Sequence, residues 1–224
     1  MSTEVIKDKI IRKGAEANLY HGYWFGKEVI FKHRLPKMYR IEEIDTNIRT
    51  TRTLNEARAL IKVKKYGLNV PQVFEIDLKN SIIIMKYIVG RKLKAILNYL
   101  EENKKKKYFK NIGQNIALLH INGHIHGDIT TSNLILTDNE EIFLIDFGLH
   151  EYSDSIEDKS VDLHLLKRVL ISSHGKDFKI CFNSFLEGYQ NIYSYTSIQD
   201  CKSIIKNIAV IESRGRYVKK EERL

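Results

Sequence analysis

The chain contains the segment His126-Gly127-Asp128-Ile129-Thr130-Thr131-Ser132-Asn133, and Leu144-Ile145-Asp146-Phe147-Gly148 follows it. Apolar residues adjoin both segments, so rigid elements can hold their polar side chains at a cleft. Asp128, Asn133 and Asp146 supply oxygen ligands and proton acceptors. Mg²⁺ prefers one or two carboxylates together with phosphate oxygens, and a further carboxylate can orient an attacking hydroxyl or water. The two segments therefore predict a site for Mg²⁺ and a nucleotide.

The apolar pattern around these segments predicts a small β-rich lobe followed by a mainly helical one. Strands are predicted at 7–13, 18–24, 28–34, 73–77 and 81–87, and a helix is predicted at 48–66. Beyond Gly90, helices are predicted at 108–122, 160–171, 178–193 and 198–211, with short β-like runs at 133–136 and 141–145. The expected fold class is α+β.

The composition limits the classes of protein to which this chain can belong. The 224 residues include 37 Lys+Arg and 28 Asp+Glu, which gives a net charge of +9, and they suit one domain or two small lobes. This charge permits contact with phosphate-rich partners without specifying one. The longest apolar run, at 82–85, is too short to span a bilayer, and the N-terminus lacks the pattern of a secretory signal. Cys181 and Cys201 fit neither a disulfide framework nor a zinc site, so we expect reduced thiols and a cytoplasmic protein.

The spacing of Asp128, Asn133 and Asp146-Phe147-Gly148 resembles the catalytic loop and metal motif of protein kinases. The resemblance implies that Asp128 is the catalytic base, that Asn133 is a second metal ligand and that Asp146 is the main Mg²⁺ ligand. It also implies a minimal two-lobed kinase fold with ATP between the lobes. The lobes would comprise residues 1–88 and 89–213, with a basic tail at 214–224.

A kinase also needs a lysine on its third strand to hold the α- and β-phosphates. Lys32 fits this role because it ends the apolar run that begins at Val29. The lysine should pair with a glutamate on a helix, and Glu56 fits best. Glu42 and Glu43 are rivals, but they precede the periodic part of the predicted helix.

Further motifs resemble one subgroup, the archaeal-type, single-domain PRPK-type kinases of the KEOPS complex. Its members share the short loop Gly14-Ala15-Glu16-Ala17, the catalytic loop at 126–133 and a basic tail with Arg214-Gly215-Arg216. The resemblance extends over essentially the whole chain. It implies that Gly14, Ala15 and Glu16 cover the phosphates, and that Met85, Tyr87 and Ile88 hold the adenine.

Departures from ordinary protein kinases restrict the expected activity. Gly127 replaces the arginine that would receive a phosphorylated activation loop, and Thr130 stands where Ser/Thr kinases place a lysine. No Ala-Pro-Glu motif follows Asp146, so a peptide-docking platform is not expected. By resemblance, Asp162 anchors the backbone of the catalytic loop from a helix.

The resemblance implies an Mg²⁺-ATP-dependent atypical Ser/Thr protein kinase and ATPase that serves the KEOPS complex. This complex makes threonylcarbamoyladenosine in tRNA. The implied partners are a TsaD-like threonylcarbamoyltransferase subunit, a small Cgi-type subunit and tRNA.

Two other functions stay open. A small-molecule kinase of the aminoglycoside or choline type shares the His-Gly-Asp-x-x-x-x-Asn arrangement, although the 78 residues after Asp146 leave little material for an acceptor pocket. A scaffold that binds ATP and tRNA without turnover is the other. Retention of Lys32, Asp128, Asn133 and Asp146 argues against it.

Two basic segments and one histidine cluster have simpler interpretations. His120, His124 and His126 lie close together, but Gly123 interrupts the helix between the first two, and a further ligand of the right kind is lacking. The four lysines at 104–107 are typical of a solvated helix start. The basic tail is either a frayed terminus or an arm that contacts tRNA phosphate or the nucleotide site. Its cations are Arg214, Arg216, Lys219, Lys220 and Arg223.

Overall fold

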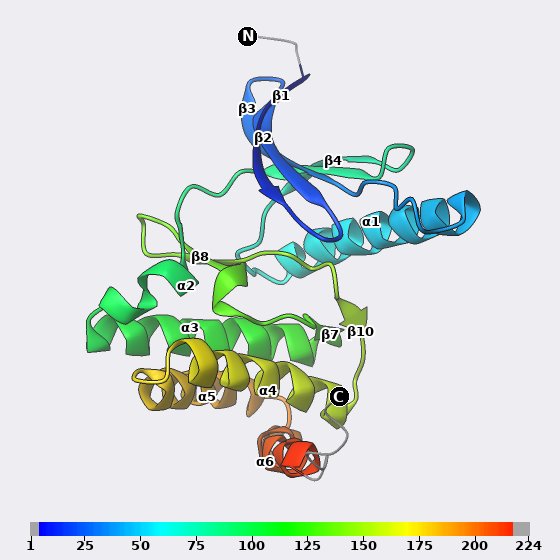
Figure 1. The fold of residues 1–224 in the computed structure, drawn as a ribbon. Helices are drawn as coiled ribbons and strands as arrows, with labels where there is room; N and C mark the ends of the chain where they lie inside the picture. Colours follow the sequence, from blue (N-terminus) through cyan, green and yellow to red (C-terminus); the bar gives the residue numbers. More distant parts are fainter. Residues whose placement is uncertain (1–4, 217–224) are drawn as a thin grey trace. The chain divides into compact units, whose positions relative to one another are not determined.

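An antiparallel sheet of five strands, in the order β1-β2-β3-β5-β4, forms the centre of the first unit of the chain (Figure 1). The computed structural model describes residues 5–216, and for residues 215 and 216 it describes the backbone alone. The strands are β1 (Val5–Lys13), β2 (Asn18–Trp24), β3 (Lys27–His33), β4 (Val73–Asp77) and β5 (Ile82–Lys86). All five coincide with predicted strands to within a few residues.

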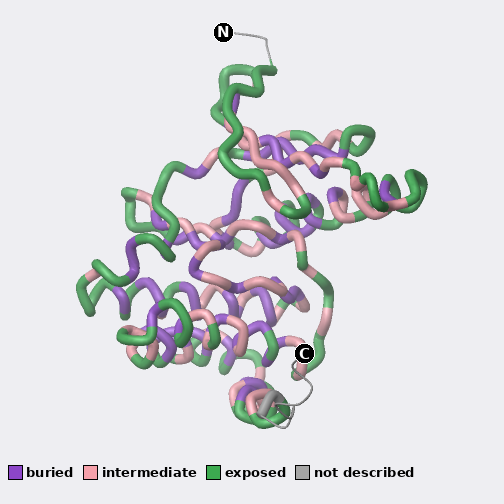
Figure 2. Tube along the Cα trace, viewed as in Figure 1, coloured by how far each residue is buried: buried purple, intermediate pink, exposed green. Residues whose placement is uncertain are grey.

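Two apolar residues of β3 lie on the opposite face of the sheet from Lys32. Val29 and Phe31 lie on one face with Ile82 and Ile84 of β5, and together they form a buried cluster. Side chains alternate along a strand, so Lys32 projects from the opposite face. Figure 2 shows buried residues inside the sheet, where β3 and β5 pair, and exposed residues along the edge strand β1.

One long helix, α1 (Glu42–Lys65), packs against β4 and β5 (Figure 1). It begins at Glu42, whereas apolar periodicity predicted a start at residue 48. Its first turn is acidic, which complements the positive end of the helix dipole, and that turn has no apolar repeat to reveal it. The buried face of α1 includes Glu56 beside Ala57 and Leu60.

Helices dominate the second unit. The longer ones are α3 (Glu102–Ile121), α4 (Ile156–Ser173), α5 (Phe178–Tyr193) and α6 (Ile198–Arg216). The shorter elements are β6 (Arg91–Lys92), α2 (Leu93–Ile96), η1 (Leu97–Tyr99), β7 (His124–Ile125), η2 (Thr131–Asn133), β8 (Leu134–Leu136) and β10 (Glu151–Tyr152). β6 pairs with β8, and β7 pairs with β10.

Two glycines allow α3 and α5 to pack closely along each other (Figure 1). A Cβ on Gly113 would lie 2.0 Å from the Phe185 carbonyl oxygen, and one on Gly188 would lie 1.9 Å from the Lys110 carbonyl oxygen. Because carbonyl oxygens of a helix cannot move aside, each contact requires glycine.

Lys105 of α3 is buried and pairs with Asp177 at 2.8 Å, so one lysine of the 104–107 run lies in the interior.

The β-rich and the helical unit together confirm the α+β fold class. The first unit comprises the residues up to Gly90 and the segment Thr137–Gly148, which contains β9 (Ile142–Leu144). That segment, with Asp146, had been expected in the lobe at 89–213. In the second unit α6 continues to Arg216, beyond the expected start of the tail at 214, and Lys219, Lys220 and Arg223 lie outside the described residues. Over residues 5–216, no helix combines the length and apolar character needed to cross a membrane.

Candidate active site

Lys32, near the end of β3, contacts two carboxylates within the first unit. Its Nζ donates to Glu56 Oε1 at 2.6 Å and to Asp146 Oδ1 at 2.7 Å. Burial alone would lower the pKa of Lys32, but the charges of Glu56 and Asp146 outweigh it and the pKa is raised. The predicted pairing of Lys32 with Glu56 is confirmed. Glu42 and Glu43 lie exposed in the first turn of α1, so they are not its partners.

A second cation, Arg34, also binds Glu56. Its Nη2 donates to Glu56 Oε2 at 2.5 Å and its Nη1 donates to Thr53 Oγ1 at 3.3 Å. Both Arg34 and Glu56 are almost fully buried. Sequence reasoning missed Arg34, although its position two residues after Lys32 placed it on the same face of the strand. Glu56 is therefore fixed from both carboxylate oxygens.

Replacing Glu56 with glutamine is expected to lower the free energy of unfolding by about 2 kcal/mol, because two buried cations lose their shared counter-charge. Urea unfolding monitored by circular dichroism measures the change. The control is Glu43→Gln, which alters an exposed glutamate on the same helix. Equal stability of the two variants would contradict a buried ion pair at Glu56.

Asp146 follows β9 in a backbone conformation that is rare for residues with a side chain. Its φ is 66°, in the left-handed region. Asp and Asn tolerate this region better than most residues, and such strain persists where the surroundings hold it. Here Lys32 holds the carboxylate, and the next residue, Phe147, is buried. Thus the first unit presents Asp146 beside the lysine.

In the second unit, Asp128 and Asn133 form the other group of predicted residues. Asn133 Nδ2 donates to the Asp128 carboxylate at 2.8 Å and to the Asp128 carbonyl oxygen at 3.0 Å. The first of these bonds fixes the direction of the Asp128 carboxylate. Both bonds use the amide nitrogen of Asn133, so Oδ1 is the atom left to coordinate a cation.

Asp162 of α4 supports the loop that carries Asp128. Its carboxylate accepts from the backbone N–H groups of His126 at 2.8 Å and Gly127 at 2.9 Å. The predicted anchoring role of Asp162 is confirmed. His120 Nε2 lies 3.2 Å from the same carboxylate, and His120 Nδ1 lies 2.9 Å from the Tyr189 hydroxyl.

Glycine is required at position 127 for a steric reason that the sequence did not reveal. The φ of Gly127 is 79°, and a Cβ there would lie 2.4 Å from the Leu149 carbonyl oxygen. An arginine, as in ordinary protein kinases, cannot occupy this position without moving the backbone. The packing of the loop therefore excludes an arginine at position 127.

The neighbouring histidines have different partners. His124 Nδ1 lies 2.8 Å from His150 Nε2, while His126 Nδ1 accepts from the Asp128 N–H at 3.2 Å. Within residues 5–216, no group of three or more His, Cys, Asp or Glu side chains could hold a metal ion. Burial, with repulsion from His124 and His126, lowers the pKa of His150 from 6.5 to about 4.

The His150 pKa predicts a pH-dependent stability. Below about pH 6.5 the unfolded chain binds a proton at His150, whereas the folded chain does so only near pH 4. The free energy of unfolding is thus expected to fall by about 2 kcal/mol between pH 7 and pH 4 through this group. Urea titrations at each pH measure this free energy, and it should change less steeply with pH in His150→Gln than in the wild type. An identical slope for His150→Gln and the wild type would contradict the assignment.

The loop between β1 and β2 contains the residues expected over the phosphates. Gly14 N–H donates to the Ala17 carbonyl oxygen at 3.1 Å, and a Cβ on Gly14 would lie 2.7 Å from that oxygen. The Ala15 carbonyl oxygen accepts from Lys37, and the Glu16 carboxylate pairs with Arg52. The loop is therefore tied to other residues of the first unit through two cations.

The residues expected to hold adenine lie at the end of β5. Met85 is buried, and Tyr87 and Ile88 line a cavity of about 340 Å³ together with residues of the turn at 137–143. The Tyr87 N–H donates to the Glu28 carbonyl oxygen at 3.2 Å. That amide is thus committed to the sheet, which leaves the Tyr87 carbonyl oxygen as its backbone group for a ligand.

The side chains present fit a nucleotide with Mg²⁺. Asp146 and Asn133 offer a carboxylate and an amide oxygen, which are hard ligands of the kind that Mg²⁺ prefers. Lys32 contacts two carboxylates, so it can turn one of its N–H donors to a phosphate while Glu56 still holds it. The structure brings Lys32, Glu56 and Asp146 together in the first unit. It brings Asp128 and Asn133 together in the second.

Comparison with known proteins adds independent findings. The RIO domain family matches residues 31–158. The chain is 44% identical over 215 residues to the KEOPS complex subunit Bud32 of Pyrococcus abyssi, which covers 93% of this chain and 96% of that protein.

Longer relatives match as well. A probable bifunctional tRNA threonylcarbamoyladenosine biosynthesis protein of Methanosphaera stadtmanae is 41% identical over 213 residues, and its counterpart in Methanobrevibacter smithii is 42% identical over 212. Each match covers 95% of this chain but only 38% and 37% of the respective relative. The chain therefore spans little more than a third of these bifunctional proteins.

Proposed function

Because this chain belongs to the RIO domain family and, within it, to the Bud32 kinases, we propose that it is the kinase and ATPase subunit of a KEOPS-type complex. Its reaction would consume Mg²⁺-ATP during threonylcarbamoyladenosine modification of tRNA. The observation that supports this most is Lys32, held between Glu56 and Asp146 by bonds of 2.6 and 2.7 Å.

Each residue has a proposed task in phosphoryl transfer. Lys32 binds the α- and β-phosphates, and Glu56, itself fixed by Arg34, keeps the ammonium in position. Asp128 accepts a proton from the attacking hydroxyl or water and orients it. Catalysis then depends on positioning and on charge stabilisation.

Asp146 and Asn133 would hold Mg²⁺, which when bound neutralises charge on the phosphates. Gly14, Ala15 and Glu16 would cover the phosphates, and backbone groups of Met85, Tyr87 and Ile88 would contact the adenine. These assignments rest on the motif positions and on the contacts described above.

The acceptor is proposed to be water or a Ser/Thr hydroxyl of the protein itself. Gly127, whose position excludes a larger residue, removes the arginine of activation-loop switching. The proposed partners are a TsaD-like threonylcarbamoyltransferase subunit, a small Cgi-type subunit and tRNA. We place the protein in the cytoplasm, where tRNA is modified.

Labelled ATP tests this proposal. The purified chain is incubated with γ-labelled ATP and Mg²⁺, with and without the transferase partner and tRNA, and free phosphate is separated from protein-bound label. Free phosphate that rises with partner and tRNA, and is absent from an Asp146→Asn blank, supports the proposed ATPase. Label that appears mainly on protein, regardless of tRNA, favours a protein kinase.

Two further outcomes identify the other functions. Turnover that appears only with added sugars or amino alcohols would indicate a small-molecule kinase. No turnover above the blank, together with intact modification by an Asp128→Ala complex, would indicate a scaffold.

A further inference from the structure

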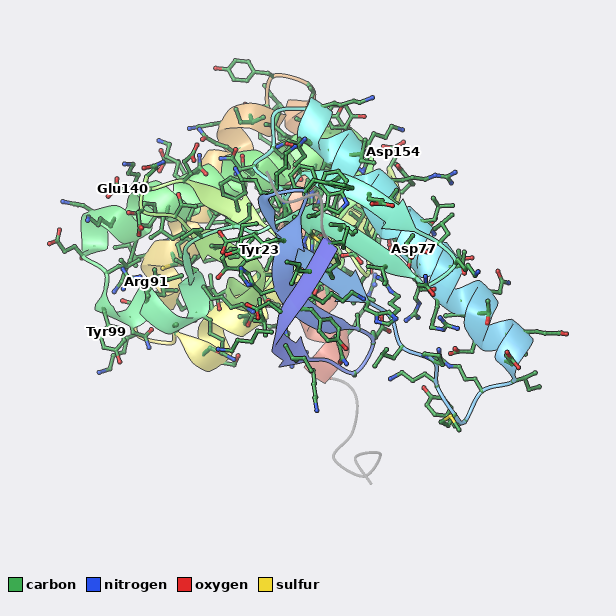
Figure 3. All side chains as sticks on the ribbon, turned by 90° about the horizontal axis from the view of Figure 1, so that it is seen from above. Tyr23, Asp77, Arg91, Tyr99, Glu140 and Asp154 are labelled. Atoms are coloured by element: carbon green, nitrogen blue, oxygen red, sulfur yellow. The ribbon has the colours of Figure 1, made fainter. Side chains whose placement is uncertain are left out.

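A basic cavity of about 180 Å³ lies in the first unit, around the first half of α1. Its walls come from the loop between β1 and β2, from residues 34–40 and from α1. Lys32, Glu56 and Asp146 do not line it. Figure 3 shows side chains projecting around the first turns of α1. The strand β4, which α1 contacts, ends at the labelled Asp77.

Cations outnumber carboxylates around this cavity. Five cationic side chains line it, namely Arg34, Lys37, Arg40, Arg49 and Arg52. Three carboxylates neutralise them. Asp45 is shared by Arg40 at 3.3 Å and Arg49 at 2.6 Å, Glu16 pairs with Arg52, and Glu56 serves both Arg34 and Lys32. An excess of two positive charges therefore faces one small space.

Arg49 is held in place by several hydrogen bonds. Arg49 donates to Asp45, and also to Ser81 Oγ at 3.3 Å and Thr46 Oγ1 at 3.4 Å. The hydrogen bond from Arg49 lowers the pKa of Asp45, which keeps that carboxylate charged. Because each guanidinium has five N–H donors in a fixed fork, donors remain after these bonds.

Arg34 supplies an unsatisfied donor. It is 2% exposed, and its buried Nε has no hydrogen-bond partner among residues 5–216. Buried polar groups are normally hydrogen-bonded, so Arg34 keeps one donor that the described residues leave unsatisfied. The negative charge that the cations around the cavity lack would come from an anion inside it.

We infer that this cavity is a phosphate-binding site, separate from the nucleotide lysine. Arginine forks match the tetrahedral oxygens of phosphate, and charge-assisted bonds to them are strong. The phosphate is either free or part of an RNA backbone, since both present the same oxygens.

Calorimetric titration with inorganic phosphate tests the site in a Lys32→Met background, which removes the nucleotide lysine, a residue that does not line the cavity. Adding Lys37→Gln and Arg40→Gln is expected to weaken phosphate binding at least roughly tenfold, because two donors are lost. The matched control adds Arg58→Gln and Lys65→Gln, which remove two exposed charges from α1. That control should bind as the background does.

Equal weakening by both pairs, or loss of binding through Lys32→Met alone, would overturn the inference. A second titration with tRNA at several salt concentrations distinguishes the sources. If the slope of log K for tRNA against log salt concentration is smaller by about one in the cavity variant, the site binds a phosphate of the RNA backbone. If that slope is unchanged while inorganic phosphate binds more weakly, the site binds free phosphate. Both titrations are independent of ATP turnover, so their failure leaves the proposed kinase function untouched.

Discussion

Replacement of Asp146 by asparagine is expected to reduce ATP turnover roughly 10³-fold or more. Asparagine keeps the size of the side chain and tolerates the φ of 66° at this position. It lacks the negative charge with which Asp146 would hold Mg²⁺ and pair with Lys32. Lys32 still has Glu56 as a partner, so the fold should persist.

Release of labelled phosphate measures the effect, and thermal melting verifies the fold. The matched control is Asp8→Asn, which removes an exposed carboxylate from β1 of the same unit. Turnover in the control should equal that of the wild type. If Asp146→Asn retained a tenth of the wild-type rate, Asp146 would not be the main metal ligand.

Replacement of Asp128 by asparagine is expected to lower kcat about 10³-fold, with little change in the KM for ATP. The amide cannot accept the proton that the carboxylate accepts, although it can still bond to Asn133. The backbone around residue 128 is held by Asp162 through bonds of 2.8 and 2.9 Å, so the loop should keep its shape.

Steady-state kinetics at saturating Mg²⁺ provide the measurement, and Asp200→Asn, an exposed change on α6 of the same unit, is the control. A rise in KM with unchanged kcat would show that Asp128 binds substrate without acting in the chemical step. Similar kcat values for Asp128→Asn and the control would remove Asp128 from the mechanism.

Much of the candidate site could be predicted because its residues occur at fixed spacing along the chain. Lys32, Glu56 and Asp162 all have the neighbours that the sequence analysis expected. Periodicity also located the strands of the sheet and the helix α5, whose bounds coincide with the prediction. It failed at the start of α1, where acidic residues stabilise a helix end without an apolar repeat.

Contacts between distant residues that belong to no recognised motif could not be predicted. Arg34 reaches Glu56 across 22 positions, and Lys37 reaches Ala15 across another 22. Gly127 must be glycine because of Leu149, which no local pattern reveals. The basic cavity arises in the same way, since a loop, a connecting segment and a helix each supply part of its wall.

The sequence alone determined the α+β fold class, the kinase motifs and the candidate chemistry of this protein. These features depend on residue type and spacing, which local backbone geometry converts directly into position. Tertiary structure alone decided that Glu56 has two cationic partners, that Asp146 adopts a left-handed conformation beside Lys32, and that five cations surround one cavity. The physical reason is that charge balance and close packing depend on which distant segments meet, and a single chain read in order does not show those meetings.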